Sequence, residues 1–221
     1  MQYDIFISYS HKDNIADEGE DGWVDSFHKG LYKYLTGRLG RKAEIWRDKL
    51  RMRGNYRLDQ ALVHNVKNSR IFLPILSPSY INSAYCLEEL KIFCEHNNNT
   101  HDVETCIFPI VKSEIDKPPT LIEQNLLKFA FFALDAYGEP SQELDPSFGE
   151  KSRNEFNQKI ADLAREVAEF IEAVEKEEAA AKAGGEGAAA EKKAKAAAAE
   201  PPPDEEIPII YLAEPSLDLF D

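Results

Sequence analysis

The segment IFLPILSPSYINSAYCLEEL, residues 71–90, decides the fold of this chain. Its apolar half, residues 71–76, predicts a buried β-strand, and the Ser, Pro and Asn residues that follow predict a turn. A helix then begins near residue 84. Tyr85 and Glu89 are four residues apart, so this helix places them on one face. Both are expected at the carboxyl edge of a parallel sheet, where α/β proteins bind ligands.

Other residues of this helix indicate its orientation. Cys86, Leu90 and Phe93 follow the i, i+4, i+7 spacing of a face that packs on a core. Glu88 is turned by about 100° from Glu89. We therefore expect Glu89 to face the candidate site and Glu88 to face solvent.

Strands and helices alternate along the remainder of residues 1–137. Further strands are predicted at residues 3–9 (YDIFISY), 43–48 (AEIWRD), 105–111 (TCIFPIV) and 129–134 (FAFFAL). Helices are predicted at residues 23–35, 58–66 and 84–94, with a weaker one at 121–127. Residues 10–13 are expected to form a loop. This alternation predicts an α/β fold with a doubly wound, five-stranded parallel sheet.

The chain divides into four predicted segments. These are an α/β domain at residues 1–137, an irregular stretch and long helix at 138–174, a linker at 175–206 and a final segment at 207–221. The long helix carries an apolar stripe formed by Phe156, Ile160, Leu163, Val167, Phe170 and Val174. The stripe fits a helix docked on the sheet, which we favour, or a short coiled-coil seam for self-association.

The last two segments differ sharply in composition. Residues 175–203 are mostly Ala, Glu, Lys and Gly and end in three prolines, as expected of a partly helical linker. Residues 207–212 (IPIIYL) return to strand character. They indicate either a truncated second domain that begins near Ile207, expected to be regulatory, or a strand that docks on a sheet edge.

Composition disfavours several classes of partner and location. The net charge of −14 argues against nucleic acid and anionic membranes as partners. No segment resembles a signal peptide, and no apolar run approaches the roughly 20 residues that a membrane helix needs. The three cysteines show no metal-ligand spacing and are interpreted as buried thiols in a reducing compartment. We expect a cytoplasmic protein without a metal or cofactor.

Four blocks of the sequence, in this order, resemble a Toll/interleukin-1 receptor (TIR) domain of the bacterial type. The blocks are YDIFISYS (3–10), IWRD (45–48) with Gly54, SRIFLPILS (69–77) and YCLEEL (85–90). The resemblance covers roughly residues 3–135. It implies a flavodoxin-like, five-stranded parallel sheet, in agreement with the alternation described above.

The resemblance also implies an activity. Many bacterial members of this family cleave NAD+ at the nicotinamide–ribose bond with a glutamate in the third helix, four residues after a tryptophan. Glu89 matches this glutamate, and Tyr85 replaces the tryptophan, whose larger ring would stack more strongly on a nucleotide. The implied substrate-binding residues are Tyr9, Ser10, His11, Asp48, Tyr56 and Tyr85.

The chemistry of this bond is compatible with a single carboxylate. Its cleavage passes through an oxocarbenium-like ribosyl cation, as glycoside hydrolysis does. Nicotinamide leaves NAD+ as a neutral molecule, so no general acid is needed, and one carboxylate can stabilise the cation. The sequence shows no convincing carboxylate pair, Ser/His/Asp triad or metal motif. NAD+ is then a substrate and not a cofactor.

Three functional hypotheses follow. The first is an NAD+ glycohydrolase or ADP-ribosyl cyclase that acts as a bacterial defence or stress effector. The second is a non-catalytic TIR scaffold that mediates homotypic interaction, and the third is an α/β receiver or other binding domain. Glu89 favours the first over the second, and Ser8-Tyr9-Ser10 disfavours a receiver, whose paired acids follow the first strand. Self-association is implied by the resemblance, because assembly commonly completes the site in this family.

Overall fold

The structure is a computed structural model that describes residues 2–16, 18–48, 60–97, 103–122, 129–135, 137 and 140–197. Met1–Glu175 form one compact unit, and Lys176–Asp221 form a second. No helix within the described ranges combines the length and the apolar character needed to cross a bilayer.

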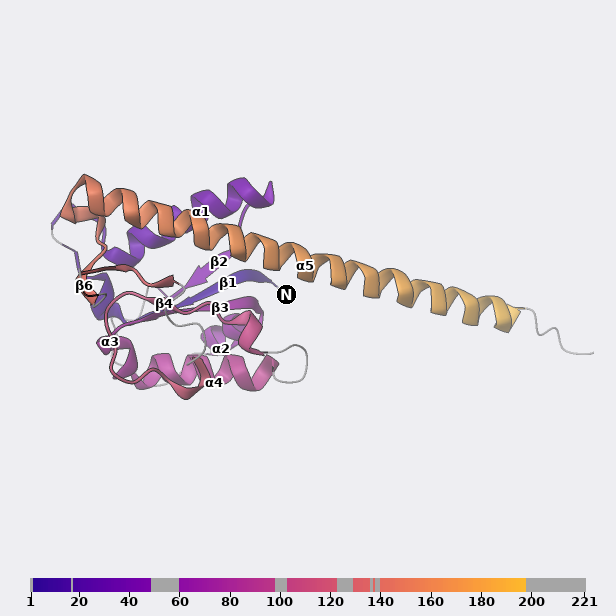
Figure 1. Cartoon of the computed structure of the whole chain (residues 1–221). Coiled ribbons are helices and arrows are strands. Elements are labelled where there is room, and N and C mark those ends of the chain that lie inside the picture. The colour runs from indigo at the N-terminus through magenta and orange to yellow at the C-terminus, as the bar shows by residue number, and fades with distance from the viewer. Residues whose placement is uncertain are drawn as a thin grey trace, which may run out of the picture. The chain divides into compact units, whose positions relative to one another are not determined.

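A parallel β-sheet forms the centre of the first unit (Figure 1). Within the described residues its strands are β1 (Tyr3–Ser8), β2 (Ile45–Arg47), β3 (Ser69–Leu76) and β4 (Ile110–Val111). Their order is β2-β1-β3-β4, and every pair is parallel. β1 and β3 are central, and their nearly continuous apolar sequences suit strands buried on both faces. The predicted α/β class and parallel sheet are confirmed.

Helices cover both faces of this sheet (Figure 1). On one side lie α1 (Trp23–Leu39) and the first part of α5 (Glu150–Ala197). On the other lie α2 (Gln60–Lys67), α3 (Pro78–Ile81) and α4 (Ala84–Asn97). Successive side chains of a strand point to opposite faces of the sheet, so alternate residues of one strand belong to the two different cores. Ile5 and Ile7 contribute to the α1/α5 core, whereas Phe6 contributes to the α2/α4 core.

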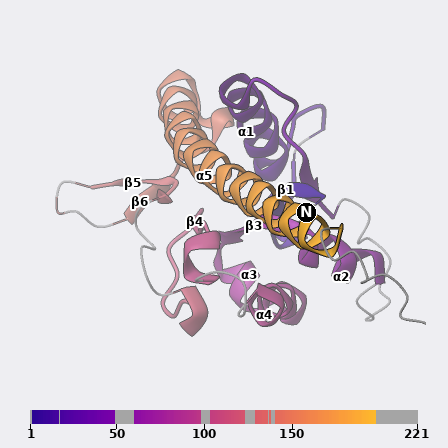
Figure 2. The same ribbon diagram turned by 90° about the vertical axis from the view of Figure 1, so that its right-hand side faces the viewer.

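The predicted fifth strand differs from expectation. The ladder of parallel strands ends at β4, which reaches Ala130 through one isolated parallel bridge from Val111. The chain then forms β5 (Phe132–Leu134), which pairs antiparallel with β6 (Pro140–Glu143). Figure 2 shows this hairpin beside β4. Within residues 129–134, Ala130 pairs in parallel with Val111 of β4, and Phe132–Leu134 then pair antiparallel with β6. The antiparallel pairing is possible because β6 follows within a few residues and antiparallel strands need only a short connection.

Four shorter segments also differ from the sequence-based expectations. Residues expected as a loop after β1 form a 3-10 helix, η1 (His11–Asn14), and the start of the predicted fourth strand forms η2 (Val103–Cys106). The predicted turn after β3 contains α3, because Pro78 occupies its first turn and Ser77 caps it by accepting a hydrogen bond from the Tyr80 amide at 3.0 Å. The weak helix predicted at 121–127 is represented by η3 (Thr120–Ile122), and residues 123–128 lie outside the described ranges.

The long C-terminal helix α5 begins at Glu150, within the stretch predicted at 138–174, and continues past residue 174 into the predicted linker. Ala, Glu and Lys are strong helix formers, so this composition supports the continuation. Phe156, Ile160, Leu163 and Val167 are buried in the α1 core, as the docked interpretation of the stripe requires. Residues 207–221, where a second domain or a docking strand was predicted, lie outside the described residues.

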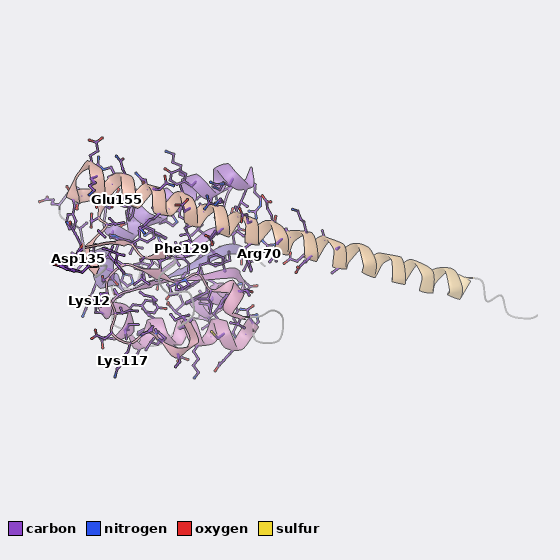
Figure 3. The ribbon with its side chains drawn as sticks, in the orientation of Figure 1. Lys12, Arg70, Lys117, Phe129, Asp135 and Glu155 are labelled. Carbon is purple, nitrogen blue, oxygen red and sulfur yellow. The ribbon has the colours of Figure 1, made fainter. Side chains whose placement is uncertain are left out.

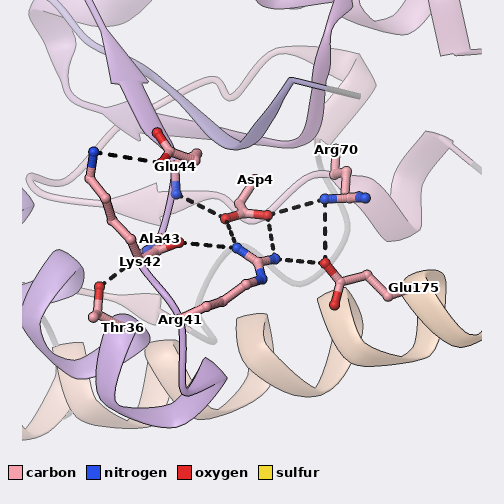
Figure 4. A network of polar contacts seen from close by, with 8 residues as sticks. All are labelled: Asp4, Thr36, Arg41, Lys42, Ala43, Glu44, Arg70 and Glu175. Atoms are coloured by element: carbon pink, nitrogen blue, oxygen red, sulfur yellow. Dashed lines mark hydrogen bonds and ion pairs between the residues drawn. The ribbon is translucent and has the colours of Figure 1, made fainter.

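A cluster of four charges joins α5 to the amino end of the sheet (Figure 4). Asp4 is 2% exposed, and both of its carboxylate oxygens accept hydrogen bonds from Arg41 at 2.8 Å. Arg70 lies 3.2 Å from the same carboxylate, and Arg41 also donates to Glu175 of α5 at 2.7 Å. Burial by itself raises the pKa of Asp4, but the Arg41 hydrogen bonds, the Glu44 amide and the arginine charges lower it below its ordinary value of 3.8.

We expect Asp4→Asn to lower the free energy of unfolding at pH 7 by about 1–3 kcal/mol, because two arginines lose the charge that they surround. A carboxyl group with a lowered pKa stabilises the fold above its ordinary pKa, and this contribution is lost as the pH falls through the folded-state pKa. The difference between wild type and variant should therefore shrink below pH 3.8. Urea denaturation across the pH range measures it, and a difference that is constant with pH contradicts the assignment.

Candidate active site

The predicted site residues gather where β1 and β3 end. Figure 3 labels Lys12 just beyond the carboxyl end of β1 and Arg70 near the amino end of β3, at opposite ends of the sheet. Because the strands are parallel, Ser8 at the end of β1 and the helices that follow β3 meet at the Lys12 end. In open parallel sheets this edge is the usual position of ligands.

Glu89 is a buried carboxylate on α4. Its exposure is only 2%, and its neighbours Cys86, Leu90 and Phe93 are buried in the core beneath the sheet. The Ser8 hydroxyl donates a hydrogen bond to Glu89 Oε2 at 2.6 Å, which is short and fully buried. Glu88, which was expected to face solvent, is half-buried and therefore more exposed than Glu89. A buried carboxylate needs such donors, because desolvating it without them is very unfavourable.

The phenol of Tyr80 supports this contact from α3. Its oxygen lies 3.2 Å from Ser8 Oγ and donates to the Cys86 carbonyl at 3.3 Å. Burial raises the pKa of Tyr80 well above its ordinary value of 10. The phenol therefore stays protonated at any physiological pH, and it remains a hydrogen-bond donor beside the Ser8–Glu89 pair.

Ser8 and Tyr80 were not among the predicted site residues. The signal for Ser8 was present in the sequence, because strand alternation puts it on the same face as Phe6, the face that α4 covers. The signal for Tyr80 was absent, because the short helix that carries it was predicted as a turn.

A second group of predicted residues lies on the other side of β1. Tyr9 is buried with the α1 core, and its hydroxyl donates to the Asp48 carbonyl at 2.7 Å. The His11 ring lies 5.2 Å from the Tyr9 ring, centroid to centroid. Burial raises the pKa of Tyr9, and the charge of Glu89 adds to this effect while Arg47 opposes it. The two groups are therefore within electrostatic reach of each other, although no direct hydrogen bond between them is observed in the described residues.

Ser10, Tyr85 and Tyr56 are the remaining predicted site residues, and the structure gives the burial of the first two. Ser10 is 9% exposed, and Tyr85 is half-buried one helical turn before Glu89. Tyr56 lies outside the described residues. The structure thus brings Glu89 together with Ser8, and Tyr9 together with His11 and Asp48, at one edge of the sheet.

The arrangement offers one buried carboxylate with a fixed orientation. In the described part of the chain no three His, Cys, Asp or Glu side chains are grouped so that they could hold a metal ion. Glu89 is a single carboxylate on the same helix as the Tyr85 ring. Such a carboxylate can stabilise a cation, because an oriented charge has a larger electrostatic effect away from bulk water.

The Ser8 hydroxyl is expected to contribute more to stability than a buried serine that bonds only to the backbone. Ser8→Ala should lower the free energy of unfolding by about 2 kcal/mol, because a hydrogen bond to a carboxylate is lost. The matched control is Ser69→Ala, which removes an equally buried hydroxyl that donates to the Asn65 carbonyl. We expect Ser69→Ala to lower the free energy of unfolding by about 1 kcal/mol. Equal losses in urea denaturation would contradict a special contact between Ser8 and Glu89.

Comparison with known proteins identifies the family. The profile of the TIR domain matches residues 5–144, which is more than half of the chain. No curated protein gives a significant match. Among solved structures, the chain is similar to the TIR domains of the activated Roq1 resistosome directly recognizing the pathogen effector XopQ. That match has 17% identity, covers 74% of this chain and 84% of the other, and has a TM-score of 0.36. The family match, over the elements that carry the candidate site, shows that this chain belongs to the TIR domain family.

Proposed function

We propose that this protein is an NAD+ glycohydrolase that cleaves the bond between nicotinamide and ribose, with Glu89 as its catalytic residue. The observation that carries the proposal is the buried Glu89 carboxylate, held by a 2.6 Å hydrogen bond from Ser8 at the carboxyl edge of the sheet. Glutamates on helix surfaces are usually solvated. A buried glutamate that accepts a hydrogen bond from a buried side chain is commonly found at a functional site.

In the proposed reaction the bond between the ribose C1′ and the nicotinamide nitrogen breaks, and its electron pair stays with nicotinamide. The pyridinium is thereby neutralised, and the ribose becomes an oxocarbenium-like cation. The Glu89 carboxylate stabilises this cation through its charge. Water then adds to C1′ and releases a proton, which gives ADP-ribose. If the adenine of the same molecule adds in place of water, the product is a cyclic ADP-ribose.

The Ser8 hydroxyl bonds Oε2 of Glu89 and so fixes the plane of the carboxylate. Fixing a charged group before the reaction avoids its reorganisation during the reaction, which is how enzymes gain most from electrostatic stabilisation. Tyr85 precedes Glu89 by one helical turn on α4. We propose that its ring stacks on a ring of the substrate. Tyr9, Ser10, His11 and Asp48 are proposed to border the rest of the dinucleotide.

The proposed biological setting follows from the family. We infer that the enzyme acts as a defence or stress effector in the cytoplasm and that copies of the domain associate before they are active. The same copies could instead serve as a scaffold without catalysis. The Glu89 carboxylate with its Ser8 hydrogen bond favours the enzyme, because contacts between copies of a scaffold are made by exposed side chains and Glu89 is only 2% exposed.

Purified protein at high concentration is expected to release nicotinamide from NAD+. Glu89→Gln should reduce this rate by about a hundredfold or more, because it removes the charge at nearly constant shape. The matched control is Glu88→Gln, which removes the neighbouring acid and should retain activity. Nicotinamide release, followed by chromatography, measures both variants, and circular dichroism checks that the fold is intact.

Two results would contradict the proposal. The first is a wild type and a Glu89→Gln variant that show the same near-zero turnover, even when the protein is crowded or clustered; the scaffold hypothesis would then be favoured. The second is a Glu88→Gln variant as inactive as Glu89→Gln, which would show that the neighbouring acid is also required.

Tyr85→Trp is expected to lower the KM for NAD+ by roughly two- to fivefold, because the larger indole offers more area for stacking at similar hydrophobic character. The control is Tyr137→Trp, which makes the same change at a residue that is 90% exposed. Steady-state kinetics distinguishes the two. An unchanged KM in Tyr85→Trp would indicate that this ring covers the core and does not contact substrate.

A further inference from the structure

We propose that Asp13 is a positioning residue that holds both parts of the candidate site, the segment with Tyr9–His11 and the Glu89 carboxylate, in one arrangement. This inference rests on the proposed function and extends it to a residue that touches neither NAD+ nor the reacting atoms.

Asp13 ties the end of β1 to the ends of two other strands. Its side chain is buried in η1, and its Oδ2 accepts a 2.6 Å hydrogen bond from the hydroxyl of Ser77, directly after β3. Its Oδ1 lies 3.6 Å from the ammonium of Lys112, directly after β4. The Asp13 amide donates to the Ser10 carbonyl at 2.8 Å. Asp13 thereby links the segment that carries Tyr9, Ser10 and His11 to the ends of β3 and β4, in addition to the hydrogen bond that Tyr9 makes to the Asp48 carbonyl after β2.

The same carboxylate is connected to Glu89 through buried polar groups. Ser77, which bonds Asp13, also accepts the Tyr80 amide at 3.0 Å and so sets where α3 begins. The Tyr80 hydroxyl in turn lies 3.2 Å from Ser8 Oγ, and Ser8 donates to Glu89. Each of these contacts involves buried groups, so we expect a displacement of Asp13 to be passed on through Ser77 and Tyr80 to Ser8.

Lys112 is held in place by groups other than Asp13. Its ammonium lies 3.0 Å from the Glu143 carboxylate of β6 and 5.8 Å from the centre of the Trp23 ring. Glu143 accepts a further hydrogen bond from Ser113. A cation fixed by a second acid and an aromatic ring is a stationary reference point to which Asp13 attaches the η1 segment.

The charge of Asp13 does not serve stability. Burial raises its pKa, and this effect, to which Glu143 adds, outweighs the opposing contributions of Ser77 and Lys112. The folded protein therefore holds a proton at Asp13 more tightly than the unfolded chain does, so stability falls as the pH rises through the raised pKa. Removing the charge should not destabilise the fold at pH 7. We explain the carboxylate by its contact with Lys112, which an uncharged side chain does not reproduce and which positions the η1 segment.

The test compares Asp13→Asn with Asp4→Asn in the full chain. Asp13→Asn preserves shape and should leave the melting temperature equal to or above that of wild type, while kcat/KM for NAD+ falls by roughly ten- to a hundredfold, with kcat lowered and KM raised. Asp4→Asn, a buried aspartate at the opposite end of the sheet, should show the reverse, with lower stability and unchanged kinetics of the folded fraction. Asparagine at position 13 that retains kcat/KM within about twofold overturns the inference.

A second measurement does not depend on turnover. Amide hydrogen exchange of residues 9–13 and of Tyr80 should be faster in Asp13→Asn than in wild type, while residues of β1 before Ser8 keep their protection. Unchanged exchange at residues 9–13 and Tyr80 overturns the inference even if NAD+ is not a substrate. A wild type that does not cleave NAD+, together with faster exchange in the variant, overturns the proposed function and leaves the positioning role of Asp13 supported.

Discussion

The parallel pairing of β1 with β3, buried between two layers of helices, is the constraint from which the remainder of the structure follows. Because side chains alternate along β1, its residues are assigned in turn to the two cores. The alternation continues past the last apolar residue. Ser8 is directed toward α4 and bonds Glu89, whereas Tyr9 is directed toward α1 and bonds the end of β2. Two adjacent residues thereby supply the two sides of one candidate site.

The two ends of the sheet use buried charge in opposite ways. At the amino end, Asp4 is surrounded by two arginines that lower its pKa, so its charge stabilises the fold and anchors α5 through Glu175. At the carboxyl end, burial raises the pKa of Asp13, and its carboxylate shares the Lys112 cation with Glu143. The buried aspartate at the amino end therefore stabilises the fold through its charge, whereas the one at the carboxyl end is proposed to position the candidate site.

Local sequence patterns predicted much of the fold correctly. The apolar runs located β1, β2 and β3, and the helical spacing of Cys86, Leu90 and Phe93 gave the face of α4 that packs on the core, whereas the burial of Glu89 was not predicted. The pattern at residues 129–134 was read correctly as extended, but its pairing was not. An apolar run indicates that a strand is present and says nothing about which neighbour its backbone will bond. Here the nearby β6 competes with β4, and the strand is shared between them.

By itself the sequence determined the order of most elements, the α/β class, the face of α4 that packs on the core and the blocks that mark a TIR domain. These depend on neighbours within about one or two helical turns or on strand alternation, which are local properties of a chain. Only the tertiary structure decided that Ser8 bonds Glu89, 81 residues away, that Asp13 bonds Ser77, and that Arg41 reaches Glu175 across 134 residues. Such contacts depend on how whole elements pack, and the periodicity of the sequence does not predict them. A polar residue at a strand end has the same local sequence pattern whether its partner is water or a buried carboxylate.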